Sequence, residues 1–337
     1  MKNTLYLISN EKISQNNEMF YCDNLDMKST PEGLNKYFDV KIIARKSKVS
    51  RSQKIHLKTI KTFSSIFSYL SEVMKLPKNN SKFLIISLTP FTFLAGIILI
   101  LSGQKPFLYL RSNGYDEYKI ILGTLGKFIY HLMFIIITRF SILISCREYI
   151  LRGKKGYIVS PSQLDSSWQE NHSKPNIKEI KLIYVGRIKK EKGIFSLLNL
   201  IKDQSNINLT VVGASEEDKK ITQSNVEILN IVRDKKELIK FYDKNNITIL
   251  PSFTEGYPMV ILESLSRRRP VIIFKEIEHV IENRIGIFVS NRNFAGLFEK
   301  INHIISNYNS IQESMKINKL PDNESFINQL KKILSKN

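Results

Sequence analysis

The stretch LPSFTEGYPMVILE, residues 250–263, constrains the fold more than any other part of the chain. The apolar, β-branched residues that lead into it predict a buried strand, which ends at Pro251. A polar loop with Gly256 follows, and a helix begins at about Met259. The first amide groups of such a helix have no partner within it and point back at the loop, where they can hold an anion.

Two carboxylates lie in this stretch, Glu255 in the loop and Glu263 about one turn into the helix. Their spacing allows both side chains to line one pocket and contact one ligand. For either glutamate alone, a solvated loop with a helix-dipole carboxylate is the alternative, because acidic residues are common near helix N-termini. The full combination of strand, Pro-Ser, Glu-Gly-Tyr-Pro and second glutamate favours a ligand site.

This combination resembles the signature of the retaining glycosyltransferases of family 4, in which two glutamates separated by seven other residues occupy such a strand, loop and helix. The resemblance implies the GT-B fold, with two Rossmann-like doubly wound α/β domains facing each other across a cleft, and a nucleoside diphosphate sugar as the donor. It also implies that Glu263 accepts hydrogen bonds from the ribose hydroxyls. Glu255, with the backbone of Gly256 and Tyr257, is expected to hold the sugar and face the anomeric carbon.

A second element of the sequence suits the same ligand. The predicted strand 181–185 leads to Gly186 and Arg187, and a basic loop ends at Lys192 and Gly193 before a helix. Positive charge, fixed donors and a helix N-terminus come together there, which suits a diphosphate. A solvated loop is the alternative for the basic run alone. Its similarity to the Gly-Arg and Lys-Gly element of family 4 favours a phosphate clamp.

These residues predict how a leaving group is stabilised without a metal ion. Negative charge grows on the β-phosphate as the sugar departs, and Arg187, Lys192 and the amides of Met259 and Val260 can stabilise it. The sequence has no Asp-x-Asp element, so we expect no metal and no cofactor besides the donor substrate. Asn230, in a turn that follows a predicted strand, resembles the base-contacting turn of the family.

Alternating strands and helices run through both halves and predict parallel α/β sheets. In the N-terminal half, predicted strands occupy residues 4–9, 39–44, 83–89, 107–112, 141–146 and 156–160. In the C-terminal half, they occupy residues 181–185, 209–213, 226–230, 246–250, 270–274 and 285–289, with helices at residues 194–201, 235–245, 294–306 and 324–335.

Candidate acceptor residues lie in the N-terminal half. Arg111 and Asn113 follow the strand that begins at residue 107, and open parallel sheets bind ligands at the carboxyl ends of their strands. A structural turn rich in Asn and Gly is the alternative. Two features depart from the family: this strand end has no histidine, and residues 10–14 after the first strand have no glycine. The polar residues 10–35 predict a mobile acceptor loop.

For two apolar segments of the N-terminal half, the sequence allows either packing against protein or contact with a lipid bilayer. Residues 56–76 have the spacing of an amphipathic basic helix, which can rest on an anionic bilayer or pack on the sheet. Residues 83–104 carry no charge and are long enough to span a bilayer. Because Pro90 divides them, we predict a buried strand followed by a helix over residues 91–101.

A second apolar helix is predicted over residues 120–140. Lys127, His131 and Arg139 interrupt it, which favours a helix packed against protein or lying at a membrane interface. The run of three arginines at residues 267–269 follows another helix, where the family has a glycine before the proline. Capping of that helix is the simpler role for these arginines, and a membrane or acceptor-phosphate contact is the alternative.

The length and composition indicate two domains. With 337 residues, 42% of them hydrophobic, the chain can form two cores. We predict an acceptor domain over residues 1–163, a linker over 164–176 and a nucleotide-sugar domain over 177–322. A terminal helix spans residues 323–337, and packing against the N-terminal domain is one option for it.

Charge indicates the partners. The chain has 51 Lys and Arg against 31 Asp and Glu, with 25 against 12 through Asn176. Basic residues interleaved with large apolar ones favour an anionic membrane surface, while a general solubility role is the alternative. No motif supports nucleic acid. Cys22 and Cys146 read as reduced thiols, and the N-terminal apolar run is too short for a signal peptide. We therefore expect a cytoplasmic protein, peripheral at the inner face of the plasma membrane.

The sequence thus predicts a metal-independent, retaining transferase of the hexosyltransferase type. It would move a sugar from a nucleoside diphosphate sugar to a glycan or lipid-linked acceptor in cell-surface polysaccharide synthesis. The alternative from another class is a catalytically silent GT-B-like partner subunit that binds a nucleotide sugar or a membrane. A nucleotide-sugar epimerase on the same fold is a more distant enzymatic alternative.

Overall fold

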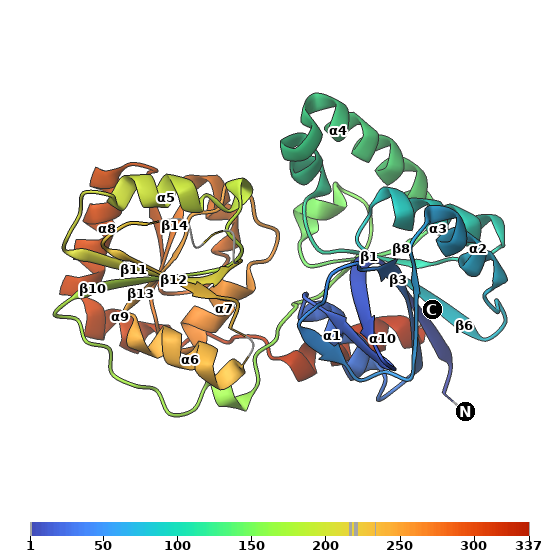
Figure 1. Cartoon of the computed structure of the whole chain (residues 1–337), viewed down its shortest axis with the longest axis horizontal. Helices are drawn as coiled ribbons and strands as arrows, with labels where there is room; N and C mark the ends of the chain where they lie inside the picture. Colours follow the sequence, from blue (N-terminus) through green and yellow to red (C-terminus); the bar gives the residue numbers. More distant parts are fainter. Residues whose placement is uncertain (1, 216–217, 219–221, 233, 337) are drawn as a thin grey trace. The chain divides into compact units, whose positions relative to one another are not determined.

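The chain forms two compact units, drawn in Figure 1. The computed structural model describes residues 2–215, 218, 222–232 and 234–336. The N-terminal unit contains Met1–Gln163 together with Asp322–Asn337, and the C-terminal unit contains Leu164–Pro321. The last helix of the chain therefore folds with the first unit and not with the second.

The sheet of the N-terminal unit is centred on β1 (Thr4–Asn16). The other strands are β2 (Met19–Cys22), β3 (Asp39–Lys46), β4 (Gln53–Ile55), β5 (Thr59–Phe63), β6 (Ser81–Ile86), β7 (Phe107–Leu110), β8 (Ile142–Ser145) and β9 (Tyr157–Ile158). From β1 the parallel strands β3 and β5 extend to one side, and β6, β7, β8 and β9 to the other. The chain thus reverses its direction of growth between β1 and β6, the point where doubly wound sheets bind ligands.

Helices cover both faces of this sheet (Figure 1). They are α1 (Asp26–Leu34), α2 (Ile66–Lys75), α3 (Pro90–Leu101), α4 (Gly114–Arg139) and α10 (Asn323–Lys336). Residues of α1 and α10, such as Met27 and Leu330, share one core cluster with Leu5 and Leu7 of β1. On the other face, α3 lies between α2 and α4 and contacts both. The terminal helix therefore completes the N-terminal core.

The C-terminal unit contains, within the described ranges, a six-stranded parallel sheet in the order β12-β11-β10-β13-β14-β15. The strands are β10 (Ile180–Val185), β11 (Ile207–Ala214), β12 (Val226–Asn230), β13 (Ile247–Leu250), β14 (Val271–Phe274) and β15 (Ile287–Ser290). Strands β13 and β14 are buried along their whole length, which explains their unbroken apolar sequences. The direction of growth reverses between β10 and β13.

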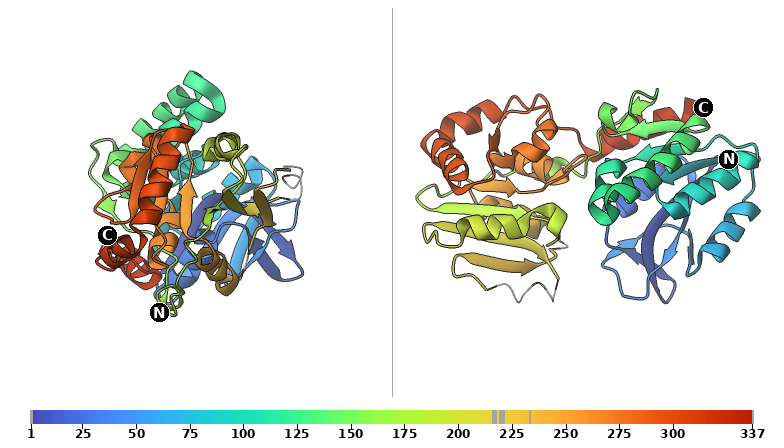
Figure 2. Two further views of the ribbon diagram at one scale, coloured as in Figure 1. Left: turned by 90° about the vertical axis from the view of Figure 1, so that its left-hand side faces the viewer. Right: turned by 90° about the horizontal axis from the view of Figure 1, so that it is seen from above.

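Helices also cover both faces of the second sheet, as Figures 1 and 2 show. They are α5 (Ile194–Ile201), α6 (Lys235–Lys244), α7 (Met259–Ser266), α8 (Phe294–Ser306) and α9 (Tyr308–Met315). Side chains of α5 and α8 share one core cluster, while α6 and α7 pack on the opposite face with Ile183 and Val212. The predicted strand and helix pattern of this half is confirmed, and α9 is the one described α-helix of the unit that was not predicted.

The structure corrects two predictions for the N-terminal half. Residues 56–76 do not form a single helix, because β5 occupies Thr59–Phe63 and α2 begins only at Ile66; the β-branched residues in this segment favour a strand. Residues 10–35 are not a loop. β1 continues through a register shift between Ile8 and Lys12, and β2 and α1 follow. Residues 10–35 are polar and follow no regular hydrophobic period, so the sequence did not reveal these elements.

Residues 164–176, expected as a linker, pack onto the C-terminal unit. Leu164 and Trp168 are buried in a cluster with residues of α6 and α7. The Trp168 ring makes an edge contact with Tyr242, with 5.8 Å between ring centroids. These two side chains are part of this unit's core, while most of the other residues of the segment are exposed.

The arginines at residues 267–269 end α7 as the predicted cap, with the amides of Arg268 and Arg269 donating to the carbonyls of Leu265 and Ser264. Arg267 and Arg269 are buried, and Arg267 donates to both carboxylate oxygens of Asp243, at 2.9 and 2.8 Å. The two guanidinium groups also donate to backbone carbonyls of residues 168–173. The left-handed residue is Arg268, with φ of 52°. Buried arginines cannot contact a membrane or an acceptor phosphate; they attach the 168–173 segment to the unit.

Candidate functional site

The loops that follow β10 and β13 meet where the C-terminal sheet reverses its direction of growth. The amide of Phe253 donates to the carbonyl of Glu191 at 3.0 Å. Gly193 has φ of +67°, and a Cβ atom placed on it would lie 1.8 Å from the carbonyl oxygen of Pro251. Only glycine fits this position. The two sequence elements predicted to share a ligand therefore lie against each other.

Lys192 and Glu255 form an ion pair at this junction. Lys192 Nζ donates to Glu255 Oε1 at 2.7 Å, and the Ser252 hydroxyl donates to the same oxygen at 2.6 Å. The Glu255 side chain is 10% exposed and that of Lys192 25% exposed. Glu255 therefore holds the Lys192 ammonium group between the loops that follow β10 and β13 before any ligand binds. This position is set within the protein, as electrostatic stabilisation of a leaving group requires.

Arg187 lies at the carboxyl end of β10, and its side chain is exposed. The buried Tyr184 hydroxyl donates to the Arg187 carbonyl at 2.7 Å. Burial raises the pKa of Tyr184, so this hydroxyl stays protonated and keeps the turn in place. Asn230 ends β12 at the same edge of the parallel sheet and is also exposed. The predicted phosphate and base contacts thus share one edge.

Glu263 lies in α7 and is buried, with 9% exposed. The Tyr242 hydroxyl of α6 donates to Glu263 Oε2 at 2.7 Å. Burial and the neighbouring carboxylate raise the pKa of Tyr242 well above its ordinary value, so the tyrosine remains a donor. The bond fixes the orientation of the carboxylate. The two predicted glutamates therefore have different partners, and the ribose contact of Glu263 stays a prediction.

The remaining predicted donor contacts belong to the loop before α7 and to its first turn. Gly256 is buried, and Met259 and Val260 begin the helix, where the first amides have no partner within the helix itself. The Tyr257 hydroxyl accepts from Arg284 at 3.1 Å, and the guanidinium group of Arg284 lies 5.3 Å from the centre of the Tyr257 ring. Tyr257 is thus held by a cation before any sugar contact.

Two residues that the sequence did not single out support these loops. Arg292, after β15, donates to the carbonyls of Pro251 and Ser252 at 2.9 and 3.2 Å, and its guanidinium group lies 4.0 Å from the centre of the Phe253 ring. His279 Nε2 lies 2.9 Å from the carbonyl oxygen of Glu255. Arg292 follows a parallel strand at the ligand-binding edge, so the rule applied to Arg187 would have found it. His279 carries no such signal.

Arg292 is in turn held by Glu276, with 2.6 Å between Nε and Oε1. Burial acts to raise the pKa of Glu276, but the hydrogen bond from Arg292, a backbone hydrogen bond and the charge of Arg292 outweigh it, and the net shift is downward. Glu276 is therefore ionised at neutral pH and keeps Arg292 oriented toward the loop.

The acceptor candidates of the N-terminal unit have partners within that unit. Arg111 Nε donates to the Ser87 hydroxyl at 3.3 Å, and Arg111 Nη1 lies 3.6 Å from Asp26 Oδ2. Asn113 Nδ2 donates to Asp116 at 2.5 Å in the first turn of α4. The structure therefore places both residues at the carboxyl end of β7, and it turns the Asn113 amide toward a helix.

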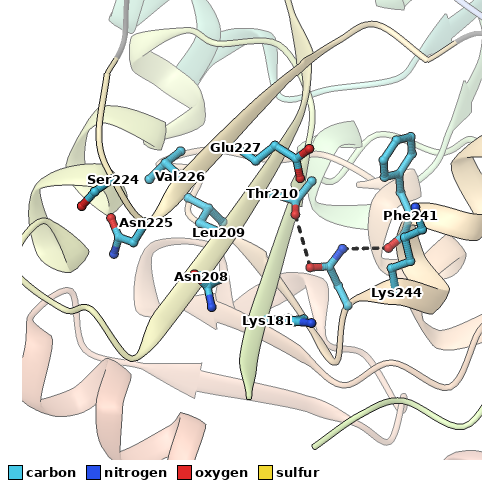
Figure 3. A pocket seen from close by; sticks show the side chains of 11 residues that line it. Lys181, Asn208, Leu209, Thr210, Ser224, Asn225, Val226, Glu227, Phe241 and Lys244 are labelled. Atoms are coloured by element: carbon cyan, nitrogen blue, oxygen red, sulfur yellow. Dashed lines mark hydrogen bonds between the residues drawn. The ribbon is translucent and has the colours of Figure 1, made fainter. Parts of the chain in front are cut away.

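A pocket of the C-terminal unit, shown in Figure 3, lies away from these residues. Its lining includes Lys181, Asn208 and Asn225, at or just before the amino ends of β10, β11 and β12. Thr210 donates to Asn245 across it (Figure 3). Ligands of open parallel sheets bind at the carboxyl ends, so this pocket is not the candidate site. In the part of the chain that the structure describes, no group of three or more His, Cys, Asp or Glu side chains is placed to hold a metal ion.

A comparison with known sequences matches the part of the chain that contains the loops after β10 and β13 to a glycosyltransferase family. Residues 165–320 match the family described as glycosyl transferases group 1. The capsular polysaccharide biosynthesis glycosyltransferase CapM of Staphylococcus aureus is 28% identical over 167 residues, which are 45% of this chain and 44% of CapM. The teichuronic acid biosynthesis glycosyltransferase TuaC of Bacillus subtilis, itself named as putative, is 33% identical over 91 residues, 27% of this chain and 23% of TuaC. The chain thus spans less than half the length of these relatives.

Comparison with solved structures extends over the whole chain. HepE of Anabaena, solved in complex with UDP and glucose, has a TM-score of 0.71 at 12% identity and covers 100% of both chains. A sucrose-phosphate synthase from Thermosynechococcus elongatus has a TM-score of 0.70 at 14% identity, covering 99% of this chain and 98% of that one. At this identity the likeness establishes the fold. The chain therefore has the GT-B fold, and its residues 165–320 match the family described as glycosyl transferases group 1.

Proposed function

We propose that this protein is a retaining glycosyltransferase that transfers a sugar from a nucleoside diphosphate sugar to a glycan or lipid-linked acceptor in cell-surface polysaccharide synthesis. The observation that carries the proposal is the Lys192–Glu255 pair, held between the loops after β10 and β13. The family of the C-terminal unit and the names of CapM and TuaC support it. HepE, solved with UDP and glucose, supports the donor class.

The proposed mechanism assigns the leaving group to Lys192 and Arg187. As the bond between the anomeric carbon and the β-phosphate oxygen breaks, charge on the diphosphate is stabilised by these cations and by the first amides of α7. Glu263, oriented by Tyr242, accepts hydrogen bonds from the ribose. Glu255, with Gly256 and Tyr257, holds the sugar. The acceptor hydroxyl attacks the same face that the diphosphate leaves, and a phosphate oxygen takes its proton.

Metal independence and location belong to the same proposal. The sequence has no Asp-x-Asp element, so in this proposal Arg187 and Lys192 stabilise the negative charge of the diphosphate in place of a metal ion. EDTA should therefore leave the turnover unchanged. The basic excess of the chain supports a place at the inner face of the plasma membrane. Arg111 and Asn113 are the proposed acceptor contacts, because they follow β7 at its carboxyl end.

A thermal-shift panel tests the donor site. UDP, GDP and ADP and their sugars are added to the wild type, to Arg187→Ala and to Glu263→Ala. A ligand that binds the native state raises its melting temperature, so one nucleotide series should stabilise the wild type and neither variant. Glu299→Ala, an exposed position of α8 in the same unit, is the matched control and should respond like the wild type.

Absence of any shift at millimolar nucleotide would contradict the proposed donor site and favour the catalytically silent subunit. A shift without nucleoside diphosphate release in the presence of acceptor extracts would favour the same alternative. A released free sugar epimer would indicate epimerase chemistry. Product analysis by NMR of the anomeric configuration tests retention, since an inverted linkage would contradict the same-face mechanism.

A further inference from the structure

Helix α4 is apolar on its exposed side as well as on its buried side. Tyr130, Phe134 and Ile137 face the core of the N-terminal unit. After a break in the helix at Gly123, the opposite side carries a stripe of exposed apolar residues at helical spacing, which we call the α4 stripe: Leu125, Phe128, Leu132 and Ile135. Leu125 is 65% exposed and Phe128 58% exposed. An exposed helix face in a soluble protein is ordinarily polar, so the stripe indicates a partner.

Neighbouring helices on the same face of the sheet add to this surface. Leu101, at the end of α3, is 82% exposed, and Phe67 of α2 is 83% exposed. Helix α3 carries no charged residue at all. It contacts both α2 and α4, and a Cβ atom on its Gly96 would lie 2.5 Å from Ile137 of α4. Helices α2, α3 and α4 therefore form one layer that exposes several large apolar side chains on its outer side.

Basic residues accompany the stripe. Lys119, Lys127 and Arg139 are exposed on α4 itself. The guanidinium group of Arg152 lies 4.5 Å from the centre of the Tyr115 ring at the start of α4, which brings the loop with the exposed Lys154 and Lys155 to this end of the helix. Apolar side chains flanked by cations match the acyl and phosphate layers of an anionic lipid surface.

The geometry of α4 favours a position in the plane of the membrane. The helix has 26 residues and is apolar enough to cross a bilayer by length and composition. It is interrupted at Gly123, where φ is 65° and ψ is −150°. The part after this break, residues 124–139, is about 24 Å long, against about 30 Å for the hydrocarbon core. Its other side is packed into a folded core, which a spanning helix would have to leave.

We propose that the α4 stripe docks the N-terminal unit on an anionic lipid bilayer, with α4 parallel to the membrane plane. The proposal does not depend on transferase activity, because the docking residues are separate from the donor-site residues. If the proposed function is also correct, Arg111 and Asn113, directly before α4, lie at the lipid surface. A lipid-linked acceptor would then reach them without leaving the bilayer.

Co-sedimentation of the full chain with vesicles tests the docking. The vesicles contain phosphatidylglycerol and phosphatidylcholine, or phosphatidylcholine alone. The variant L125E/F128E places two carboxylates on the stripe and should lower binding to the anionic vesicles by more than about tenfold. The matched control is F195E/I317E, which changes two exposed apolar residues of the C-terminal unit and should bind like the wild type. Equal melting temperatures of the variant and the wild type show that the fold is kept.

The same vesicles also measure how deeply the stripe enters the bilayer, and they distinguish a lipid surface from a second copy of the chain. The variant F128W should show a blue-shifted emission with vesicles and quenching by brominated acyl chains. Wild-type protein that ignores anionic vesicles at low salt, or L125E/F128E binding as tightly as the wild type, would overturn the proposal. It would also be overturned if the wild type formed a dimer that L125E/F128E abolished while neither bound vesicles, since a second copy would then cover the stripe. Failure of the nucleotide panel leaves these readouts unaffected.

Discussion

The parallel strands of the two units follow the same order around their first strand, although the N-terminal sheet adds the antiparallel strands β2 and β4. The units differ in the loops and surfaces that surround these strands. Both sheets grow outward in two directions from their first strand, β1 or β10. In the C-terminal unit, the loops at the reversal point are tied by Arg292, Gly193 and the Lys192–Glu255 pair. In the N-terminal unit, Arg111 and Asp26 are 3.6 Å apart and partly exposed. Topology alone thus does not decide how firmly a site is built.

The difference extends to the surfaces of the two units. The C-terminal unit buries two charged side chains, since Arg267 and Arg269 are among the largest fully buried side chains of the described residues. The N-terminal unit instead exposes apolar side chains on α4. A nucleotide has one shape and demands fixed donors, whereas a bilayer is fluid and demands area and charge. The same fold can therefore carry the proposed nucleotide site in one unit and the proposed membrane surface in the other.

The largest expected effect is on the buried charges. Asp243→Ala would leave Arg267 and Arg269 without their carboxylate, which costs about 3–5 kcal/mol of unfolding free energy when a buried partner is lost. Asp26→Ala, at the looser pair of the N-terminal unit, should cost less than about 1 kcal/mol. Urea titrations measure both, with Trp168 fluorescence for the C-terminal unit, since Trp168 is the only tryptophan. Equal costs would remove the contrast.

Next comes the backbone contact at the site. Gly193→Ala adds a Cβ atom against the Pro251 carbonyl at a left-handed position, and should cost about 2–4 kcal/mol from strain and overlap together. The matched control is Gly103→Ala in the N-terminal unit, where φ is +77° and nothing lies within 4 Å. It carries only the conformational strain, about 1 kcal/mol. Thermal denaturation compares them; similar losses would show that the loops do not depend on this contact.

The leaving-group assignment predicts a kinetic effect. Lys192→Ala should lower turnover by on the order of 10²-fold, as for other single oriented donors. Lys190→Ala, two residues earlier and exposed, is the control and should change turnover by less than about twofold, because surface charges contribute little. Release of the nucleoside diphosphate from the donor measures both variants. A Lys192→Ala rate equal to that of the wild type would remove Lys192 from the mechanism.

The smallest effect is expected at the supporting arginine. Arg292→Lys retains the charge but cannot reach Glu276 and two carbonyls at once, and nucleotide affinity should fall by about tenfold or less. Arg152→Lys, exposed in the N-terminal unit, should leave affinity unchanged. Isothermal titration with the stabilising nucleotide gives both values. Unaltered affinity in Arg292→Lys would mean that the loops hold their position without the guanidinium group.

Prediction from the sequence succeeded where the signal is local. The helix over Ile194–Ile201 and the strand over Val226–Asn230 are confirmed to the residue, because apolar periodicity and glycine punctuation are properties of neighbouring residues. It failed for residues 56–76, where the helical spacing of apolar residues is also compatible with a strand followed by a shorter helix. The donor-site residues were placed by motif, and their roles stay predictions.

By itself, the sequence determined the α/β class, the order of most elements and the two motifs around Lys192 and Glu255, since each depends on a few consecutive side chains. Only the tertiary structure decided that these two residues pair, that Arg292 holds their loop and that Arg267 is buried. These contacts join residues dozens of positions apart. It also decided which side of α4 faces outward, because a helix that is apolar all round carries no record of its buried face.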